Sequence, residues 1–410
     1  MTSLAVRERA DSATGDTSAS YTGPTGRDRR MDILRGAALV VFAAEVVGQI
    51  SRPNLLAFES TATVSAVALI VATEGALVGM LCRPRVAAGG LGATTLRLWR
   101  RARAWYLTAI ALTVALLLIR FVPFIDYAPI TALSVDVRGR LSLFAPPPAN
   151  AVATVVGYPL DPQVVLDVLL LRLGPWPFDV VGVLCLLLLV TPLLLRALSA
   201  GRWLPLLMVS VALYVLELFS HLRLLPTRAE ASLPILGWQA LFVIGLVAGY
   251  YRREIVQWFR RGVGAALFWL LALASLAWLA LPLVLALSSG LVVPDILHNV
   301  ASSKAGWLFE PSAPGPLRLA VALVLITASY GLLTIAWRPL NLIFGWLLGT
   351  LGSSLLPALV ALVVAAVALS SLANAGAFAV HPALLTVAVV AWMWLVSLVR
   401  ASLARRKELP

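Results

Sequence analysis

Long apolar stretches separated by short polar connections dominate the hydrophobic pattern of this chain. Many of them approach the roughly 20 residues that a helix needs to cross the hydrocarbon core of a bilayer. The pattern predicts ten membrane-spanning helices, at about 32–50, 58–82, 104–122, 176–197, 202–220, 233–251, 263–287, 316–337, 353–373 and 381–402. Another apolar segment, 341–351, is short and rich in glycine, which predicts a re-entrant or interfacial piece. We therefore expect an all-α, polytopic integral membrane protein.

The cations between these stretches predict the topology. Arginine clusters fall in every second connection, and membrane proteins concentrate Arg and Lys on the cytoplasmic side. Both termini are therefore expected in the cytoplasm. The predicted parts are a disordered polar tail (1–27), one transmembrane domain (28–403) and a basic tail (404–410). Two long connections, about 123–175 and 288–315, are expected on the outer side, as are His221, His298 and His381.

Composition narrows the classes of function. Of the 410 residues, 60% are hydrophobic and 12% charged, whereas a soluble domain has about 25% charged residues. The net charge of +13 is explained by topology signals and lipid headgroup contacts, so we expect no nucleic-acid partner. Cys82 and Cys185 lie inside apolar stretches, which predicts neither a disulfide framework nor a metal site. The sequence has no nucleophile elbow, phosphate-binding loop or zinc spacing, which argues against a self-contained hydrolase or nucleotidase.

The first two predicted helices contain charged residues that a lipid environment would reject. Asp32 and Arg35 lie one helical turn apart, so we expect them to form an ion pair at the inner boundary of the first helix. Glu45, further along this helix, must face protein or water. Glu74 in the second, oppositely directed helix is expected at a similar depth. Two carboxyl groups at one depth are able to share a proton or bind a cation.

The stretch Arg30-Met31-Asp32-Ile33-Leu34-Arg35-Gly36 resembles the first helix of the OpgC family. These are multi-spanning bacterial membrane proteins of the acyltransferase-three superfamily. Further segments similar to family motifs follow in the same order, at residues 75–80, 97–102, 178–181, 237–245 and 348–355. In the family the first helix usually ends in Asn-His, whose His is the expected catalytic residue. This chain has Glu45 and Val46 there, and Glu74 replaces the usual Ser before Gly75.

The resemblance implies transfer of an acyl group, succinyl in the named example, to a glycan hydroxyl outside the cytoplasm. The expected donor is a cytosolic thioester of the acyl-CoA type, which acts as a co-substrate, and no tightly bound cofactor is expected. The expected acceptor is an envelope glycan or a lipid-linked sugar. The bacterial cytoplasmic membrane would then be the location, with the lipid bilayer and other membrane proteins as partners.

Acyl transfer to a hydroxyl needs a base, and in this chain Glu45, with Glu74 nearby, is the predicted substitute. Its alternative role is a structural carboxylate paired with an Arg of another helix. Gln239, beside Trp238, either contacts substrate or links two helices. Six charged residues are the predicted contacts for the acyl donor: Asp32, Arg35, Arg97, Arg100, Arg101 and Arg103. The arginines among them would bind its phosphate groups. Their alternative role is to set the topology and the orientation of the helices.

Two other functions fit the same sequence. A catalytically silent relative would act as a membrane scaffold or as a partner of an envelope-polymer assembly. A transporter or flippase would use Glu45 and Glu74 for proton coupling.

Overall fold

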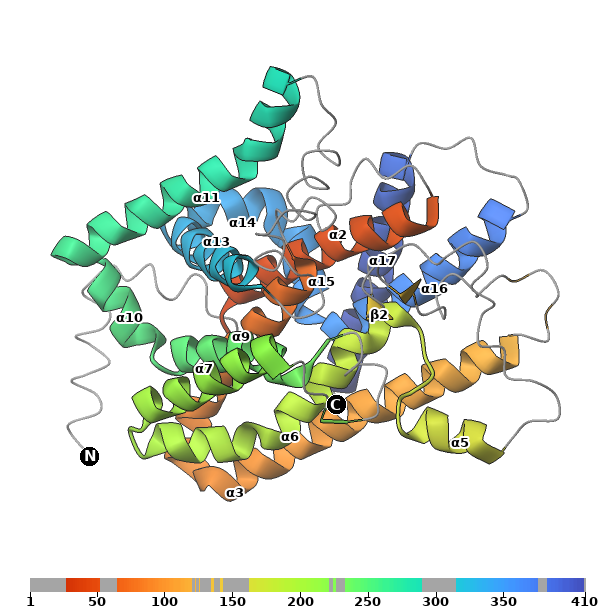
Figure 1. Cartoon of the computed structure of the whole chain (residues 1–410), viewed down its shortest axis with the longest axis horizontal. Coiled ribbons are helices and arrows are strands. Elements are labelled where there is room, and N and C mark those ends of the chain that lie inside the picture. Colours follow the sequence, from red (N-terminus) through yellow and green to blue (C-terminus); the bar gives the residue numbers. More distant parts are fainter. Residues whose placement is uncertain are drawn as a thin grey trace.

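A computed structural model describes residues 27–51, 65–119, 162–220, 233–289, 315–374 and 382–408, together with positions 122, 125, 134–135, 141–142 and 224–225. Helices make up nearly all of this part of the chain (Figure 1), and the predicted all-α class is confirmed. The strands β1 (Ser134–Val135) and β2 (Leu141–Ser142) form a short antiparallel pair. The three histidines, and most of the polar tail and of the two long outer connections, lie outside the described residues.

The helices follow the apolar stretches, because only helical backbone satisfies its own hydrogen bonds within a bilayer. They are α2 (Arg29–Ser51), α3 (Ala66–Ile119), α5 (Pro162–Leu169), η2 (Trp176–Phe178), α6 (Asp179–Ser199), α7 (Trp203–Ser220), α9 (Ile235–Tyr250), α10 (Arg252–Phe259), α11 (Gly262–Ser289), α13 (Pro316–Ile335), α14 (Trp337–Phe344), η4 (Gly345–Gly349), α15 (Thr350–Ser353), α16 (Leu355–Asn374) and α17 (Pro382–Glu408).

Within the described residues, seven helices are long and apolar enough to cross a membrane, or up to eight if the bent pair α9 and α10 forms one span. The predicted number of ten is therefore not confirmed. Helix α3 is counted as one helix, although it includes most of two predicted spans, 58–82 and 104–122. Helix α2 contains five charged residues and is not among the seven.

Helix α3 reverses direction at Gly90. This residue has a positive φ of 76°, a backbone conformation that glycine adopts without steric cost. A straight helix would place Glu74 and Arg101 about 40 Å apart, yet their side chains form an ion pair of 2.5 Å. The two limbs of α3 therefore lie side by side, with Glu74 on the first limb and Arg101 on the second.

Helices α3 and α9 cross at close range through two pairs of glycines. Gly75 and Gly79 lie against the backbone of α9 at Phe242 and Leu246, and Gly245 and Gly249 lie against the backbone of α3. A Cβ atom at any of the four would collide with the facing carbonyl oxygen. Two glycines four residues apart are the usual small-residue contact between membrane helices. This crossing fixes the first limb of α3, and with it Glu74.

Helix α2 occupies the middle of the bundle (Figure 1) and contacts α3, α13, η4, α15, α16 and α17. The segment 341–351 belongs to the run of short helices α14, η4 and α15, in which η4 is a π-helical turn. This run packs tightly on α2, because Gly36 lies against the backbone of Leu348 and Gly352 against the backbone of Asp32. The first helix is thus enclosed at its charged end.

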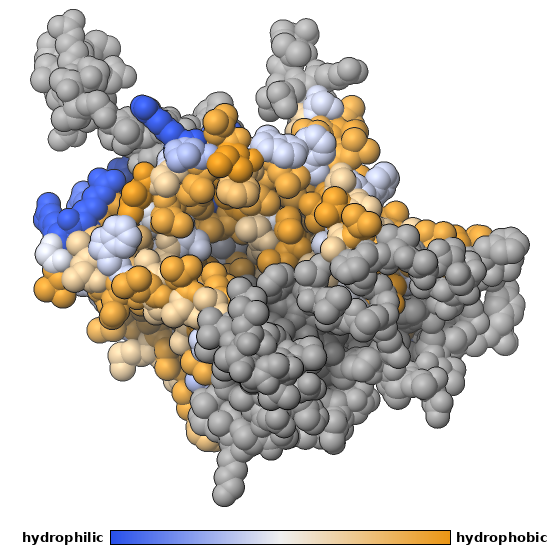
Figure 2. All heavy atoms as spheres, turned by 90° about the horizontal axis from the view of Figure 1, so that it is seen from above, coloured by the Kyte–Doolittle hydropathy of each residue, from blue (hydrophilic) through white to orange (hydrophobic). Residues whose placement is uncertain are grey.

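Hydrophobic side chains cover most of the described surface that Figure 2 shows, and hydrophilic residues gather toward one end of the molecule. Exposed apolar side chains are frequent on α7 and α11, for example Met208 and Leu270. An apolar exterior is what a lipid environment requires, so the molecule is a membrane protein.

Candidate functional site

Three charged side chains meet between α2 and the two limbs of α3. Arg35 Nη2 lies 2.7 Å from Glu74 Oε2, and Arg101 Nη2 lies 2.5 Å from Glu74 Oε1. Glu74 is fully buried and Arg35 nearly so, whereas the Arg101 side chain is 31% exposed. The Arg101 guanidinium also lies over the Trp105 ring, 4.9 Å from its centroid, a favourable cation–π contact. One carboxylate therefore faces two guanidinium groups.

A second ion pair lies at the start of α2. Arg27 donates to Asp32 Oδ1 from Nε at 2.8 Å and from Nη2 at 2.5 Å, and Nη2 also reaches the Gly352 carbonyl oxygen at 3.4 Å. The predicted ion pair between Asp32 and Arg35 is therefore wrong. Arg35 instead points to the buried Glu74, since an unpaired carboxylate there costs several kcal/mol and a pair along one helix gains only a few tenths.

A cavity of about 410 Å³ opens beside these ion pairs. Four arginines line this arginine cavity, namely Arg27, Arg35, Arg101 and Arg400. Its remaining lining residues come from α3, α15, α16, α17 and Ser354, and they are Ala104, Trp105, Ser353, Ser354, Leu355, Leu356, Pro357, Ser397 and Ala401. Among the residues that the structure describes, the four guanidinium groups form ion pairs with only two carboxylates, Asp32 and Glu74. The cavity therefore has two positive charges in excess and suits an anionic ligand.

Ser397 of α17 lines the arginine cavity and is fully buried. Its hydroxyl has no hydrogen-bond partner among the described residues. A buried polar group without a partner costs about 1–3 kcal/mol, and a polar ligand in the cavity would remove this cost. Ser397 is thus a second, independent indication of a ligand.

A neighbouring cavity of about 440 Å³ shares Ser353 and Ala401 with the arginine cavity. It is lined by Arg29 and Asp32 on one side and by Gly345 and Gly349 of the π-helical turn on the other. Turns of this kind are rare and frequently occur at functional sites. The two cavities together form a polar region at the charged end of α2.

Only one residue of the predicted basic cluster reaches this region. Arg97, Arg100 and Arg103 are exposed and line neither cavity, whereas Arg101 lines the first. Helical geometry explains this for Arg100 and Arg103, because residues one or two positions from Arg101 point in other directions around α3. The exposure of these three arginines fits their alternative role, which is to set the topology of the protein in the membrane.

Gln239 and Trp238 lie away from the arginine cavity. Gln239 Oε1 accepts a hydrogen bond from Ser210 Oγ, and Gln239 Nε2 donates to the Ser210 carbonyl oxygen, both at 2.7 Å. Gln239 therefore links α9 to α7. This is the second of the two roles expected for it, the first being a contact with substrate. Trp238 is buried within α9.

Glu45 is buried in α2, so it faces protein as the pattern predicts. It lies about 15 Å of helix rise beyond Arg35 and lines neither the arginine cavity nor the neighbouring cavity. Both oxygens of Glu74 are paired with guanidinium groups, and sharing of a proton between Glu45 and Glu74 stays a prediction. The role of Glu45 as the base stays a prediction.

A second charged cluster, the Asp28 network, lies on the other side of α2. Asp28 is buried and accepts hydrogen bonds from the Arg30 backbone and side chain, from Arg252 Nη1 at 2.8 Å and from the Tyr330 hydroxyl at 2.9 Å. Arg30 also donates to Thr334 Oγ1 and lies over the Tyr330 ring. Asp28 therefore caps α2 and ties it to α10 and α13.

Sequence reasoning treated Arg27 and Arg400 only as topology signals, and it overlooked Asp28 and Ser397. The spacing of Ser397 and Arg400, one turn apart in an apolar helix, is a usable signal that both face the same side. Nothing in the sequence indicates that this side meets Arg35 and Arg101, because α2, α3 and α17 are far apart along the chain.

Fold and site together define a polytopic α-helical membrane protein with a basic cavity where α2, α3 and α17 meet. A family model described as OpgC protein matches residues 27–405. The chain belongs to this family, so the resemblance predicted from the motifs is confirmed, and the protein is an OpgC-like, acyltransferase-type membrane protein. No curated protein and no solved structure matches the chain.

Proposed function

We propose that this protein transfers an acyl group from a phosphorylated thioester of the acyl-CoA type to a hydroxyl of an envelope glycan or lipid-linked sugar. The observation that carries the proposal is the arginine cavity, in which four arginines and the Ser397 hydroxyl surround a space of about 410 Å³. Guanidinium groups suit phosphate and carboxylate oxygens because they bind them through two parallel hydrogen bonds. A succinyl group, whose free carboxylate adds negative charge, fits this basic surrounding.

The location follows from the same proposal. Under the positive-inside rule the arginine-rich start of α2, turn of α3 and end of α17 face the cytoplasm, where the thioester donor is available. We therefore place the protein in a bacterial cytoplasmic membrane with both termini inside. Placement in the acyltransferase-three superfamily is part of the proposal.

In the proposed reaction the acceptor hydroxyl attacks the thioester carbonyl carbon. The new C–O bond forms, the C–S bond breaks, and the thiolate leaves with the electron pair. Glu45 takes the hydroxyl proton and returns it to the thiolate, so the protein ends unchanged. Because Glu45 is about 15 Å along α2 from Arg35, the acyl arm of the donor has to extend along this helix while its anionic part stays in the arginine cavity.

A matched pair of arginines on α3 tests the donor site. Arg101 lines the cavity and pairs with Glu74, whereas Arg103 is exposed on the same helix. Purified protein with a labelled acyl-CoA donor and envelope extract should transfer label, and Arg101→Gln should raise the KM for the donor about tenfold or more. Arg103→Gln should behave like the wild type. Equal KM values in the two variants, or no transfer at all, would contradict the proposal.

A catalytically silent relative, acting as a scaffold of an envelope-polymer assembly, is the second candidate. The position of Glu45 favours it, because Glu45 lines neither the arginine cavity nor the neighbouring cavity. Glu45→Gln separates the two candidates: loss of label transfer supports the enzyme, whereas an unchanged phenotype with retained protein partners supports the scaffold. Proton-coupled transport has less support, because Glu74 is held by two arginines.

A further inference from the structure

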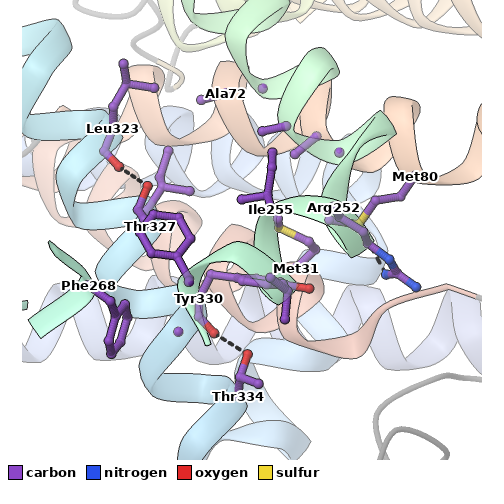
Figure 3. Close-up of a pocket in the computed structure, with 18 of the residues that line it drawn as sticks. Met31, Ala72, Met80, Arg252, Ile255, Phe268, Leu323, Thr327, Tyr330 and Thr334 are labelled. Carbon is purple, nitrogen blue, oxygen red and sulfur yellow. Dashed lines mark hydrogen bonds between the residues drawn. The ribbon is translucent and has the colours of Figure 1, made fainter. Parts of the chain in front are cut away.

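A third cavity, the apolar groove, lies between α3, α9, α10, α11 and α13 and has a volume of about 430 Å³ (Figure 3). Most of its lining side chains are aliphatic or aromatic, such as Met80, Ile255, Phe268 and Leu323. Charged lining residues are confined to Arg252 and Arg260, at the two ends of α10. The groove is separate from the arginine cavity, with which it shares no residue.

The groove is polar at one end and apolar at the other. Leu323 and Ala72 lie at one end in Figure 3, and Met31, Tyr330 and Thr334 lie at the opposite end. Along α13 the lining extends from Leu323 to Ile335, about 18 Å of helix rise. One leaflet contributes about 15 Å of hydrocarbon to a bilayer. The length and the polarity of the groove therefore match one lipid acyl chain.

The polar end has an excess of positive charge. Asp28 pairs with both Arg30 and Arg252, so one carboxylate faces two guanidinium groups there. Arg260 is exposed and forms no ion pair with any residue that the structure describes. Helix α10 bends away from α9 by 79° and has no buried residue, and Trp258 on it is exposed. Such a helix is typical of the membrane surface, where lipid headgroups lie.

From these observations we infer that the groove binds an anionic phospholipid, with one acyl chain along α13 and the phosphate group between Arg252 and Arg260. The inference does not depend on acyl transfer, and its test needs no donor or acceptor.

Native mass spectrometry of the delipidated full-length protein tests this site. The protein is mixed with phosphatidylglycerol or with phosphatidylcholine of the same chain length. We expect one phosphatidylglycerol per chain, bound about tenfold more tightly than phosphatidylcholine. Arg260→Gln should weaken phosphatidylglycerol binding about fivefold, the size expected for an exposed charge. Arg261→Gln is the matched control, since Arg261 is exposed but does not line the groove, and it should bind like the wild type.

A filled groove provides the second arm of the test. Ala248 and Thr327 line opposite helices of the groove and are only partly buried, so Ala248→Phe or Thr327→Phe places a ring in the space of the acyl chain. Whichever of them keeps the thermal unfolding midpoint of the wild type should lose both lipids. Equal binding of the two lipids in all variants would show nonspecific surface lipid and overturn the inference. If the filled variants lose lipid binding but Arg260→Gln binds phosphatidylglycerol like the wild type, the proposed contact between the phosphate group and Arg260 would be overturned.

Discussion

The two charged clusters beside α2 contain similar groups and differ in what surrounds them. Around Glu74, two guanidinium groups meet a buried carboxylate at the edge of a polar cavity. Around Asp28, two guanidinium groups, a backbone amide and a phenol surround a carboxylate that is also buried. The first arrangement leaves three ion-paired arginines facing a polar cavity, whereas the second ties α2 to α10 and α13 and lies beside the apolar groove through Arg252 and Tyr330.

This difference separates a ligand site from a structural connection. A buried carboxylate whose partners are all in place holds helices together, and Asp28 does this for α2, α10 and α13. In the arginine cavity, excess positive charge and the hydroxyl of Ser397 remain available. Donor binding is therefore expected to respond to changes at the first cluster, and stability to changes at the second.

The largest effect is expected for Asp28→Ala. This change leaves Arg30 and Arg252 without their carboxylate in a buried position, which costs about 3–5 kcal/mol. The apparent thermal unfolding midpoint in detergent should fall strongly, as measured by fluorescence or scanning calorimetry. Donor binding by the fraction that stays folded should be unchanged. A variant with a wild-type midpoint would show that the Asp28 network is not a structural connection.

Glu74→Gln should separate stability from binding. The amide keeps the shape of Glu74 but removes the charge that neutralises Arg35 and Arg101, so stability should fall by about 3 kcal/mol. The same change leaves both guanidinium groups for an anionic ligand, so the affinity for a non-reactive donor analogue should rise several-fold. Isothermal titration measures this affinity. Lower affinity in Glu74→Gln would indicate that Glu74 itself contacts the ligand.

The comparison also shows what the sequence is able to predict. The helices and the membrane class follow from apolar stretches, because the bilayer imposes one local rule on every segment. The family follows from ordered motifs, and the model match over residues 27–405 confirms it. The close packing of α3 on α9 explains the glycine pair Gly75 and Gly79 in the motif 75–80 and Gly245 at the end of the motif 237–245.

The partners of the charged residues were not predictable in the same way. Sequence reasoning paired Asp32 with Arg35 because they are neighbours on one helix, whereas the structure pairs Asp32 with Arg27 and Arg35 with Glu74. Arg101 reaches Glu74 because the chain turns at Gly90, and neither charge nor periodicity indicates how sharply the chain turns there. The pairings of Glu74 with Arg35 and Arg101 join distant parts of the chain, and no local pattern indicates them.

Arg400→Gln should have a moderate effect on ligand binding only. Arg400 is exposed and contributes charge to the rim of the arginine cavity, where a single charge is worth about 1 kcal/mol or less. Donor-analogue affinity should fall about fivefold or less at low salt. The difference from the wild type should shrink as the salt concentration rises, because salt screens exposed charges. A difference that stays constant with salt would contradict a purely electrostatic contribution.

The smallest effect is expected for Ser397→Ala, and its sign is informative. The Ser397 hydroxyl is buried without a hydrogen-bond partner among the described residues, so its removal should keep or slightly raise the unfolding midpoint. If a ligand oxygen accepts its proton, donor-analogue affinity should fall by about 1 kcal/mol, roughly fivefold. Thermal unfolding with and without the analogue measures both quantities in one experiment. Stabilisation by the analogue that is equal in the wild type and Ser397→Ala would exclude Ser397 from the ligand contacts and leave the arginines as the whole of the site.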